Sequence, residues 1–152
     1  MIVEAPLSRY KKNNIKIYIA LCIIAAGWFA YDGYSNENFI KKHTDTAGKP
    51  DSTLTFNRKS PPYLLTAAVL LGAYLFVIRN KKLSADETAL VAGSLKIPYD
   101  AIEKINKTPF NSKGYFIIEY KNRQGAPATL KLSDKTYDNL PAILDALIAK
   151  IT

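Results

Sequence analysis

The side chains that most often carry acid–base, nucleophilic or metal chemistry are scarce in this chain. His43 is its only histidine and Cys22 its only cysteine, so a Ser-His-Asp triad, a multi-histidine metal site and a disulfide framework all lack their parts. Asp86 and Glu87 are neighbouring carboxylates, but adjacent residues on a strand face opposite ways, and no base or phosphate-binding glycine loop accompanies them. The sequence predicts no enzyme, no cofactor, no metal site and no small-molecule substrate site.

Two apolar stretches dominate the elements around these residues. Residues 15–31 and 62–78 each cover 17 positions, and apart from Lys16 neither contains a charge. As helices they are about 25 Å long, near the short limit for the hydrocarbon core of a bilayer. Trp28 lies near the end of the first stretch, where aromatic rings favour the membrane interface. The pattern predicts two transmembrane helices, the second starting at Pro62.

Two other interpretations of these stretches are open. Helices buried in a soluble core are also apolar, but the roughly 70 residues after Ile78 are too few to surround two of them. A cleaved signal peptide also begins with a basic region, which Lys11 and Lys12 would provide here. Its cleavage site needs small residues, whereas bulky Trp28 and Phe29 occupy the end of the stretch. We therefore expect both stretches to remain as membrane spans.

The basic residues beside the two stretches predict the orientation of the chain. Up to Lys16 the chain holds four basic and one acidic side chain, and three basic residues follow within four positions of Ile78. Positive charge favours the cytoplasmic side. We therefore expect residues 1–14 and 79–152 in the cytoplasm of a bacterial inner-membrane protein, and residues 32–61 on the other side. This loop holds five basic and four acidic residues, so the opposite orientation stays open.

The net charge of +8 is concentrated outside the loop. After the second stretch, twelve basic residues are mixed with eight acidic ones without a long basic run, so nucleic-acid binding is not predicted. A basic domain near an anionic leaflet, where each lysine contributes about 1 kcal/mol, accounts for the excess, and so does a solvated surface that keeps strand edges soluble. The candidate contacts to lipid or to a protein partner are Arg79, Lys81, Lys82, Lys96, Lys104 and Lys113.

Small residues recur at four-residue spacing within both apolar stretches. Cys22, Ala26 and Ala30 share one helix face in the first, and Ala68 and Gly72 share one in the second. Such faces let two backbones approach closely in lipid, either within one hairpin or between the subunits of a homo-oligomer. Neither stretch carries a charge at its centre, so an ion or proton path is not predicted.

The polar loop between the stretches carries structural signals of its own. Residues 38–43 (NFIKKH) predict a short helix with two apolar side chains on one edge, and residues 44–53 are rich in turn formers. Leu54 and Phe56 then alternate with polar residues. The loop is either ordered against the membrane or a partner, or a simple connection.

The segment after the second stretch predicts an antiparallel sheet followed by one helix. The strongest strand signal is the aromatic and β-branched run 115–120 (YFIIEY), and shorter alternating runs cover 94–98, 102–107 and 128–132. The NRQG sequence before the last of these runs suits a hairpin turn. Residues 137–151 place apolar side chains at three- and four-residue steps, as an amphipathic helix does. The predicted fold class is α+β, with a two-helix transmembrane hairpin ahead of this domain.

These pieces resemble a known family. The strand entry KKLSADETALV, the phrase LKIPYDAIEKI, the arm GYFIIEYKN, the strand TLKLSD and the closing helix LPAILDALIAKI are similar to parts of the bacterial pleckstrin-homology-like (PH-like) domains found beside pairs of membrane spans. The resemblance covers residues 79–152 and implies a small PH-like antiparallel sheet or partial barrel with a C-terminal helix. Five or six strands fit this segment, whereas a complete domain of that fold has seven. A small open sheet with a helix on one face is the structural alternative.

The resemblance implies a binding platform without chemistry of its own. The predicted function is that of a non-enzymatic membrane protein whose cytoplasmic domain docks a protein partner or anionic lipid. The alternative is an accessory structural subunit of a larger membrane enzyme or transport complex.

Overall fold

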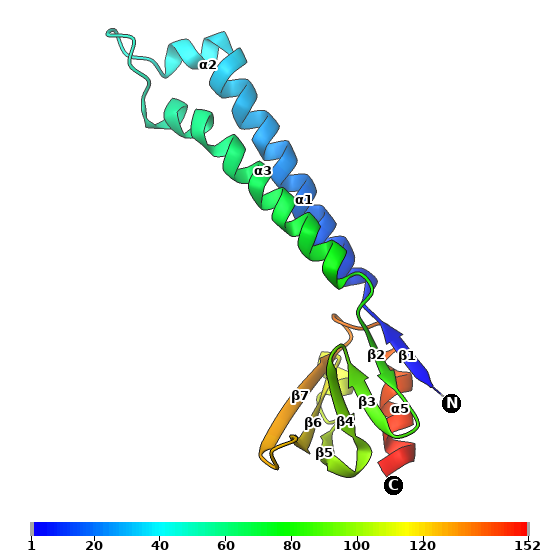
Figure 1. The fold of residues 1–152 in the computed structure, drawn as a ribbon. Helices are drawn as coiled ribbons and strands as arrows, with labels where there is room; N and C mark the ends of the chain where they lie inside the picture. The colour runs from blue at the N-terminus through cyan, green and yellow to red at the C-terminus, as the bar shows by residue number, and fades with distance from the viewer. Residues whose placement is uncertain (1, 152) are drawn as a thin grey trace. The chain divides into compact units, whose positions relative to one another are not determined.

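The structure is a computed structural model that describes residues 2–151, and it divides into two compact units. One unit is helical and covers residues Asn13–Val77. The other unit brings the first residues of the chain, up to Lys12, together with the segment from Ile78 onward. Figure 1 shows the helices and strands of both units.

The helical unit consists of two long helices and a structured connection (Figure 1). Helix α1 spans Arg9–Ala30 and continues into a π-helical turn, η1, at Tyr31–Ser35. A short helix, α2 (Glu37–Lys42), follows, and α3 spans Ser52–Ile78. The short helix predicted in the loop is therefore confirmed. Both long helices are long enough and apolar enough to cross a membrane.

Both long helices begin earlier than the sequence predicts. α1 starts at Arg9, ahead of the predicted span, and α3 starts at Ser52 rather than at Pro62. Asp51 explains the second difference, because its Oδ1 accepts the Leu54 N–H at 2.8 Å and caps the start of the helix. The alternating residues that begin at Leu54 thus belong to the first turns of α3, and the proline pair lies inside the helix.

The second unit contains seven strands in two antiparallel sheets among the residues described. Strands β1 to β4 form the first sheet in that order, and β5 to β7 form the second. The 3-10 turn η2 (Tyr99–Ala101) leads into the second sheet, α4 (Phe110–Lys113) joins β5 to β6, and α5 (Leu140–Ile151) follows β7. The strands are β1 Val3–Pro6, β2 Lys82–Ala85, β3 Ala89–Ala92, β4 Leu95–Pro98, β5 Ile102–Asn106, β6 Tyr115–Lys121 and β7 Pro127–Ser133.

The first strand of this unit comes from the opposite end of the chain. β1 pairs antiparallel with β2, and Val3 lies opposite Ala85. Ala5 and Leu7 are buried in the domain, at 0% and 3% exposure. Residues 1–14, predicted as a separate N-terminal segment, therefore contribute a strand to the C-terminal domain, and the helical hairpin interrupts that domain in sequence.

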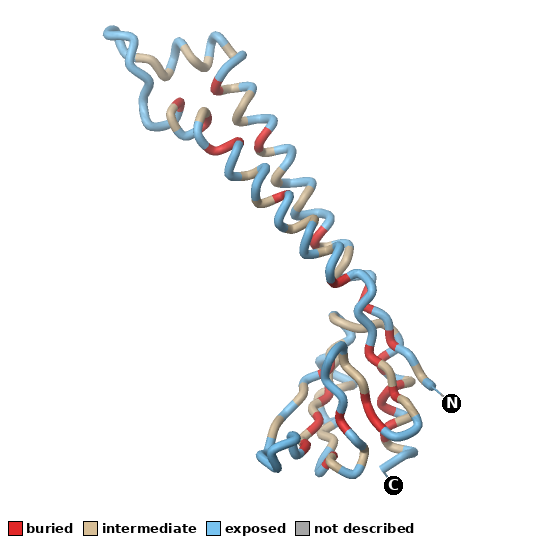
Figure 2. Tube along the Cα trace, viewed as in Figure 1, coloured by how far each residue is buried: buried red, intermediate tan, exposed pale blue. Residues whose placement is uncertain are grey.

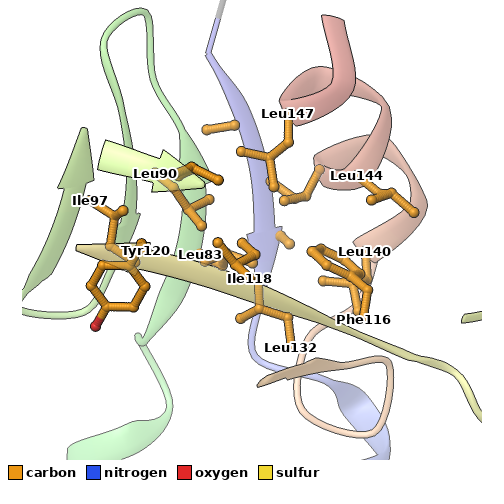
Figure 3. Close-up of a cluster of buried hydrophobic side chains, with 14 residues drawn as sticks. Leu83, Leu90, Ile97, Phe116, Ile118, Tyr120, Leu132, Leu140, Leu144 and Leu147 are labelled. Atoms are coloured by element: carbon orange, nitrogen blue, oxygen red, sulfur yellow. The ribbon is translucent and has the colours of Figure 1, made fainter. Parts of the chain in front are cut away.

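The core of the second unit lies where both sheets and α5 meet (Figure 3). Phe116 and Ile118 of β6 are fully buried, as are Leu83 and Leu90 from the first sheet. Figure 2 shows buried residues running along the strands and α5. The amphipathic pattern of the last helix is confirmed, since its buried residues are Leu140, Ile143, Leu144 and Leu147.

The α+β fold class is confirmed, and the strands predicted in the C-terminal segment are present as β4, β5, β6 and β7. The NRQG turn joins β6 to β7 as predicted. Two details differ from the prediction. α5 begins at Leu140, because Asn139 before it has a left-handed backbone with φ of 61°. Asp86 and Glu87 lie in the turn between β2 and β3, where they are not part of a strand.

Candidate functional site

Most residues of the two long helices are exposed or partly exposed, as the colours of Figure 2 show. Only 11% of the most apolar window of the first helix and 17% of that of the second is buried. Ile24 and Leu70 are each 65% exposed, Trp28 is 68% exposed and Val69 is 71% exposed. A continuous apolar surface of this kind is unfavourable in water.

The small residues predicted to pack helices lie on the more shielded faces of α1 and α3. Ala26 and Ala68 are buried, at 3% and 7% exposure, and Cys22, Ala30 and Gly72 are half-buried. A methyl group added at Gly72 would meet no heavy atom within 4 Å. Within the described chain itself, no other helix approaches the backbone of this glycine closely.

A close approach occurs instead at Gly33 in η1. A Cβ atom there would lie 3.1 Å from Arg58 Cγ and 3.2 Å from the Asn57 carbonyl carbon. Arg58 also donates its Nε–H to the Gly33 carbonyl at 2.8 Å, and its guanidinium lies 5.8 Å from the centre of the Tyr34 ring. The absence of a side chain at Gly33 is what lets η1 approach α3 this closely.

Tyr34 supplies a hydrogen bond that the proline pair removes from α3. In a regular α-helix the N–H of residue 62 would bond to the carbonyl of Arg58, but Pro62 has no N–H. The Tyr34 hydroxyl donates to that carbonyl at 2.9 Å. A side chain from η1 thus satisfies a backbone acceptor at the point where α3 continues through its prolines.

His43 and Asp51 close the connection between α2 and α3. His43 Nδ1 lies 2.7 Å from Asp51 Oδ2, and the rings of His43 and Phe39 lie 4.3 Å apart. The hydrogen bond from the Leu54 N–H, with a further contribution from His43, holds the pKa of Asp51 below its ordinary value of 3.8. The single histidine is therefore part of an ordered loop closure.

Three of the six predicted basic contacts lie where α3 leads into β2. Arg79 and Lys81 are exposed in this short connection, and Lys82 begins the strand. The Lys82 Nζ lies 2.5 Å from Glu4 Oε1 on β1. Part of the positive charge in this group is therefore balanced within the domain.

The other three predicted contacts are spread over the domain. Lys96 of β4 lines a hollow together with Lys121 and Arg123 from the end of the β6–β7 hairpin. Lys104 lies on β5, and Lys113 is the last residue of α4. The structure therefore does not bring Lys96, Lys104 and Lys113 into one site.

The junction between β1 and α1 is fixed within the sheet domain. Ser8 is fully buried, its N–H donates to the Thr136 carbonyl at 2.8 Å, and its Oγ accepts the Lys11 N–H at 3.3 Å. Asp138 Oδ2 accepts the Arg9 N–H at 3.1 Å. The strand and the start of the helix are thus held by side chains and backbone from the C-terminal end of the chain.

Two tyrosines of the sheet domain have shifted pKa values. Burial raises the pKa of Tyr99 and of Tyr137, and the Asp86 carboxylate adds to the shift at Tyr99. The Tyr99 hydroxyl donates to the Asp86 carbonyl at 2.6 Å. Among residues 2–151, no group of three or more His, Cys, Asp or Glu side chains is placed to hold a metal ion.

β1 and the contact between η1 and α3 are not predicted from the sequence. The alternation of Val3, Ala5 and Leu7 with other residues is a weak signal for a strand. A proline pair within an apolar helix leaves backbone carbonyls without their helical N–H partners, so a hydrogen-bond donor from another segment is needed. Gly33 and Tyr34 provide that second contact. No protein-family model, curated protein or solved structure matches the chain.

Proposed function

We propose that this chain is an integral membrane protein in which a two-helix hairpin anchors a small PH-like domain. The domain docks a partner at the cytoplasmic face of a bacterial inner membrane and performs no chemistry itself. Anchoring and docking are separate parts of the proposal, and different observations support them.

The pairing of β1 with β2 carries the anchoring part. The two strands are neighbours in one sheet, although both long apolar helices lie between them in the sequence. A single folded domain occupies one side of a membrane, so the segments on both sides of the helical hairpin must share that side. One helix crossing alone would separate β1 from β2. The two helices must therefore cross together or not at all.

The uncovered apolar side chains favour crossing over remaining in water. A hairpin in water would expose rings and branched side chains such as Trp28 and Val69, each more than two-thirds exposed in the structure. A bilayer covers such groups, and helices satisfy their own backbone hydrogen bonds within it.

The position of β1 argues against a cleaved signal peptide. Cleavage after the first apolar stretch would remove β1 and leave the edge of β2 unpaired. It would also remove the buried side chains of Ala5 and Leu7 from the domain and leave a cavity. We therefore propose that the first stretch is retained as a membrane span.

The strand count supports a PH-like domain. Two antiparallel sheets of four and three strands with a C-terminal helix match the seven strands expected of that fold. The segment after the hairpin supplies six of these strands, and β1 supplies the seventh. The shortage of strands in residues 79–152 is thus met from the N-terminus.

The cytoplasmic orientation is supported by charge. Four basic residues up to Lys16 and the group at Arg79, Lys81 and Lys82 lie at those ends of the two apolar stretches that join the domain in sequence. Lysines in such positions also attract anionic lipid at about 1 kcal/mol each. These basic side chains therefore favour anionic lipid as one docking partner of the domain.

Cysteine accessibility in intact cells tests the anchoring part. In a Cys22→Ala background, Ser52→Cys should react with a membrane-impermeant maleimide, whereas Ile2→Cys and Ser133→Cys should react only after the membrane is opened. Labelling of Ile2→Cys and Ser133→Cys on opposite sides would refute the two-helix anchor. Labelling of both from outside would reverse the orientation and keep the anchor.

Copurification after extraction in mild detergent tests the docking part. A substoichiometric, salt-sensitive protein partner or a lone chain bound to anionic lipid supports a docking module. A stoichiometric catalytic partner would instead assign the chain to a larger membrane complex as an accessory subunit.

A further inference from the structure

The sheet domain has four strands at sheet edges, and β1 is protected on its outer side. The Glu4 carbonyl accepts a hydrogen bond from Asn139 Nδ2 at 3.2 Å, and the Pro6 carbonyl accepts one from the Asp138 N–H at 3.0 Å. Pro6 itself has no N–H to offer. The residues before α5 therefore occupy the outer edge of β1.

Two more edges are short or interrupted. β4 has four residues and ends at Pro98, which lacks an N–H. β5 contains a register shift between Ile102 and Lys104, and such bulges disturb the regular row of donors and acceptors. Neither edge presents a continuous ladder.

β7 is different, because its outer edge is open at Thr129 and Lys131 in the middle of the strand, between Pro127, which has no N–H, and the Ser133 carbonyl, which accepts the N–H groups of Thr136 and Tyr137. The register with β6 is unbroken from Pro127 to Ser133. At the two ends of this ladder, the Asn122 N–H bonds to the Ala126 carbonyl and the Asp134 N–H bonds to the Gly114 carbonyl. Hydrogen-bonded pairs alternate with non-hydrogen-bonded pairs in an antiparallel ladder. The backbone N–H and carbonyl groups of the even-numbered residues of β7 therefore bond to β6, and those of the odd-numbered residues point away from β6.

The outward-pointing backbone groups of β7 are unpaired among the described residues. Thr129 and Lys131 each present an N–H and a carbonyl, and neither residue donates or accepts a backbone hydrogen bond outside the β6 ladder. Both residues are exposed. Such a row of donors and acceptors is the template to which an extended chain adds.

The side chains of β7 specify what kind of chain fits. Ala128 and Leu130 are only partly buried and pack against the edge of the core. On the opposite face, Lys131 is the only charged residue of the strand, and its Nζ lies 3.8 Å from the centre of the Tyr115 ring. A strand placed beside β7 would therefore set apolar side chains next to Leu130 and acidic side chains next to Lys131.

We propose that β7 is the docking edge of the domain, and that it adds an extended segment of a partner protein with alternating apolar and acidic residues. This inference rests on the proposed docking role and is independent of the membrane anchor. A second copy of the chain is a poorer occupant in the register centred on Lys131, which would set two ammonium groups opposite each other.

The test uses the full chain in mild detergent with two capped probe peptides, Val-Glu-Val-Glu-Val-Glu and Val-Lys-Val-Lys-Val-Lys. Binding is measured by fluorescence anisotropy, and amide hydrogen exchange locates the bound peptide. We expect the acidic peptide to bind more tightly than the basic one and to slow exchange at Thr129 and Lys131.

Two variants of Thr129 separate the edge from the side chain. Thr129→Pro removes an outward N–H and keeps the β6 ladder intact, so the fold is preserved and acidic-peptide affinity should fall about tenfold. Thr129→Ala keeps the backbone donor and should bind within about twofold of the parent chain. Lys131→Glu should reverse the preference between the two peptides.

Equal binding by Thr129→Pro and the parent chain, or exchange protection confined to other strands, would overturn the proposal. If the Thr129 amide is protected in the absence of peptide, and this protection grows with protein concentration, the edge binds a second copy of the chain. This result would also overturn the proposal. Because all these measurements use solubilised protein, their failure would leave the cysteine-labelling result on the anchor unaffected.

Discussion

The Tyr34 hydroxyl donates a 2.9 Å hydrogen bond to the Arg58 carbonyl, which is the acceptor that Pro62 leaves without a helical partner. We expect Tyr34→Phe to destabilise the hairpin by about 1 kcal/mol, because the Arg58 carbonyl loses its donor. Thermal unfolding of the full chain in mild detergent measures the change.

A double-mutant cycle separates this hydrogen bond from general packing. Pro62→Ala restores an N–H that can bond to Arg58, so Tyr34→Phe should cost much less in that background. Pro61→Ala is the matched control, since its N–H would serve Asn57 instead. An equal cost of Tyr34→Phe in both proline backgrounds would show that the tyrosine does not act through the Arg58 carbonyl.

Gly33 and Gly72 should respond oppositely to an added methyl group. Gly33→Ala places a Cβ 3.1 Å from Arg58 Cγ and should destabilise the hairpin by about 1–3 kcal/mol. Gly72→Ala meets open space in α3 and should raise stability by up to about 1 kcal/mol, because alanine is the better helix former. The same unfolding measurement compares them, and a loss of stability at Gly72 alone would place the close helix contact there.

Leu7 should matter to the C-terminal domain despite its distance along the chain. Leu7→Ala removes a side chain that is 3% exposed and should destabilise the domain by about 2–5 kcal/mol. Ile2→Ala, at a position 58% exposed, is the control and should have little effect. Amide exchange of β2 and β3 reports the change, and unchanged protection in Leu7→Ala would contradict the packing of this N-terminal segment into the domain.

Acid should open the loop closure at Asp51. Folded-state contacts lower the pKa of this carboxyl below 3.8, so its stabilising contribution is complete above that pH and is lost as pH falls through the lower, folded value. The protection of the Leu54 amide against exchange, corrected for intrinsic rates, should decline over this range. Asp51→Asn keeps a capping side chain but cannot ionise, so a similar decline in that variant would rule out Asp51 as the cause.

Most of the second unit could be predicted because its signals are local. The β-branched run of β6 and the apolar spacing of α5 express strand and helix periods within a few residues. β1 could not be predicted in the same way, since it has four residues and its ion-pair partner Lys82 lies 78 residues beyond Glu4.

The start of α3 shows the same limit for the helical unit. Pro61 and Pro62 favour the beginning of a helix when only local preferences are considered. In the structure the helix extends back to Ser52, capped by Asp51, and a tyrosine from η1 satisfies one of the acceptors that the prolines free. A second local signal, the Asp51 cap, and a contact from the more distant Tyr34 therefore account for the longer helix.

The pairing of β1 with β2 is tested most directly by cross-linking in native membranes. Glu4 lies opposite Ser84. The Leu7 N–H donates to the Lys81 carbonyl, so Leu7 and Lys81 form a hydrogen-bonded pair, and by alternation Glu4 and Ser84 form a non-hydrogen-bonded pair. Side chains are closest at such pairs, which suits a disulfide. In a Cys22→Ala background, Glu4→Cys with Ser84→Cys should form an intramolecular disulfide under mild oxidation, whereas Glu4→Cys with Ser52→Cys should not. Absence of the first disulfide in folded, membrane-inserted protein would contradict the pairing and the shared side of the two termini.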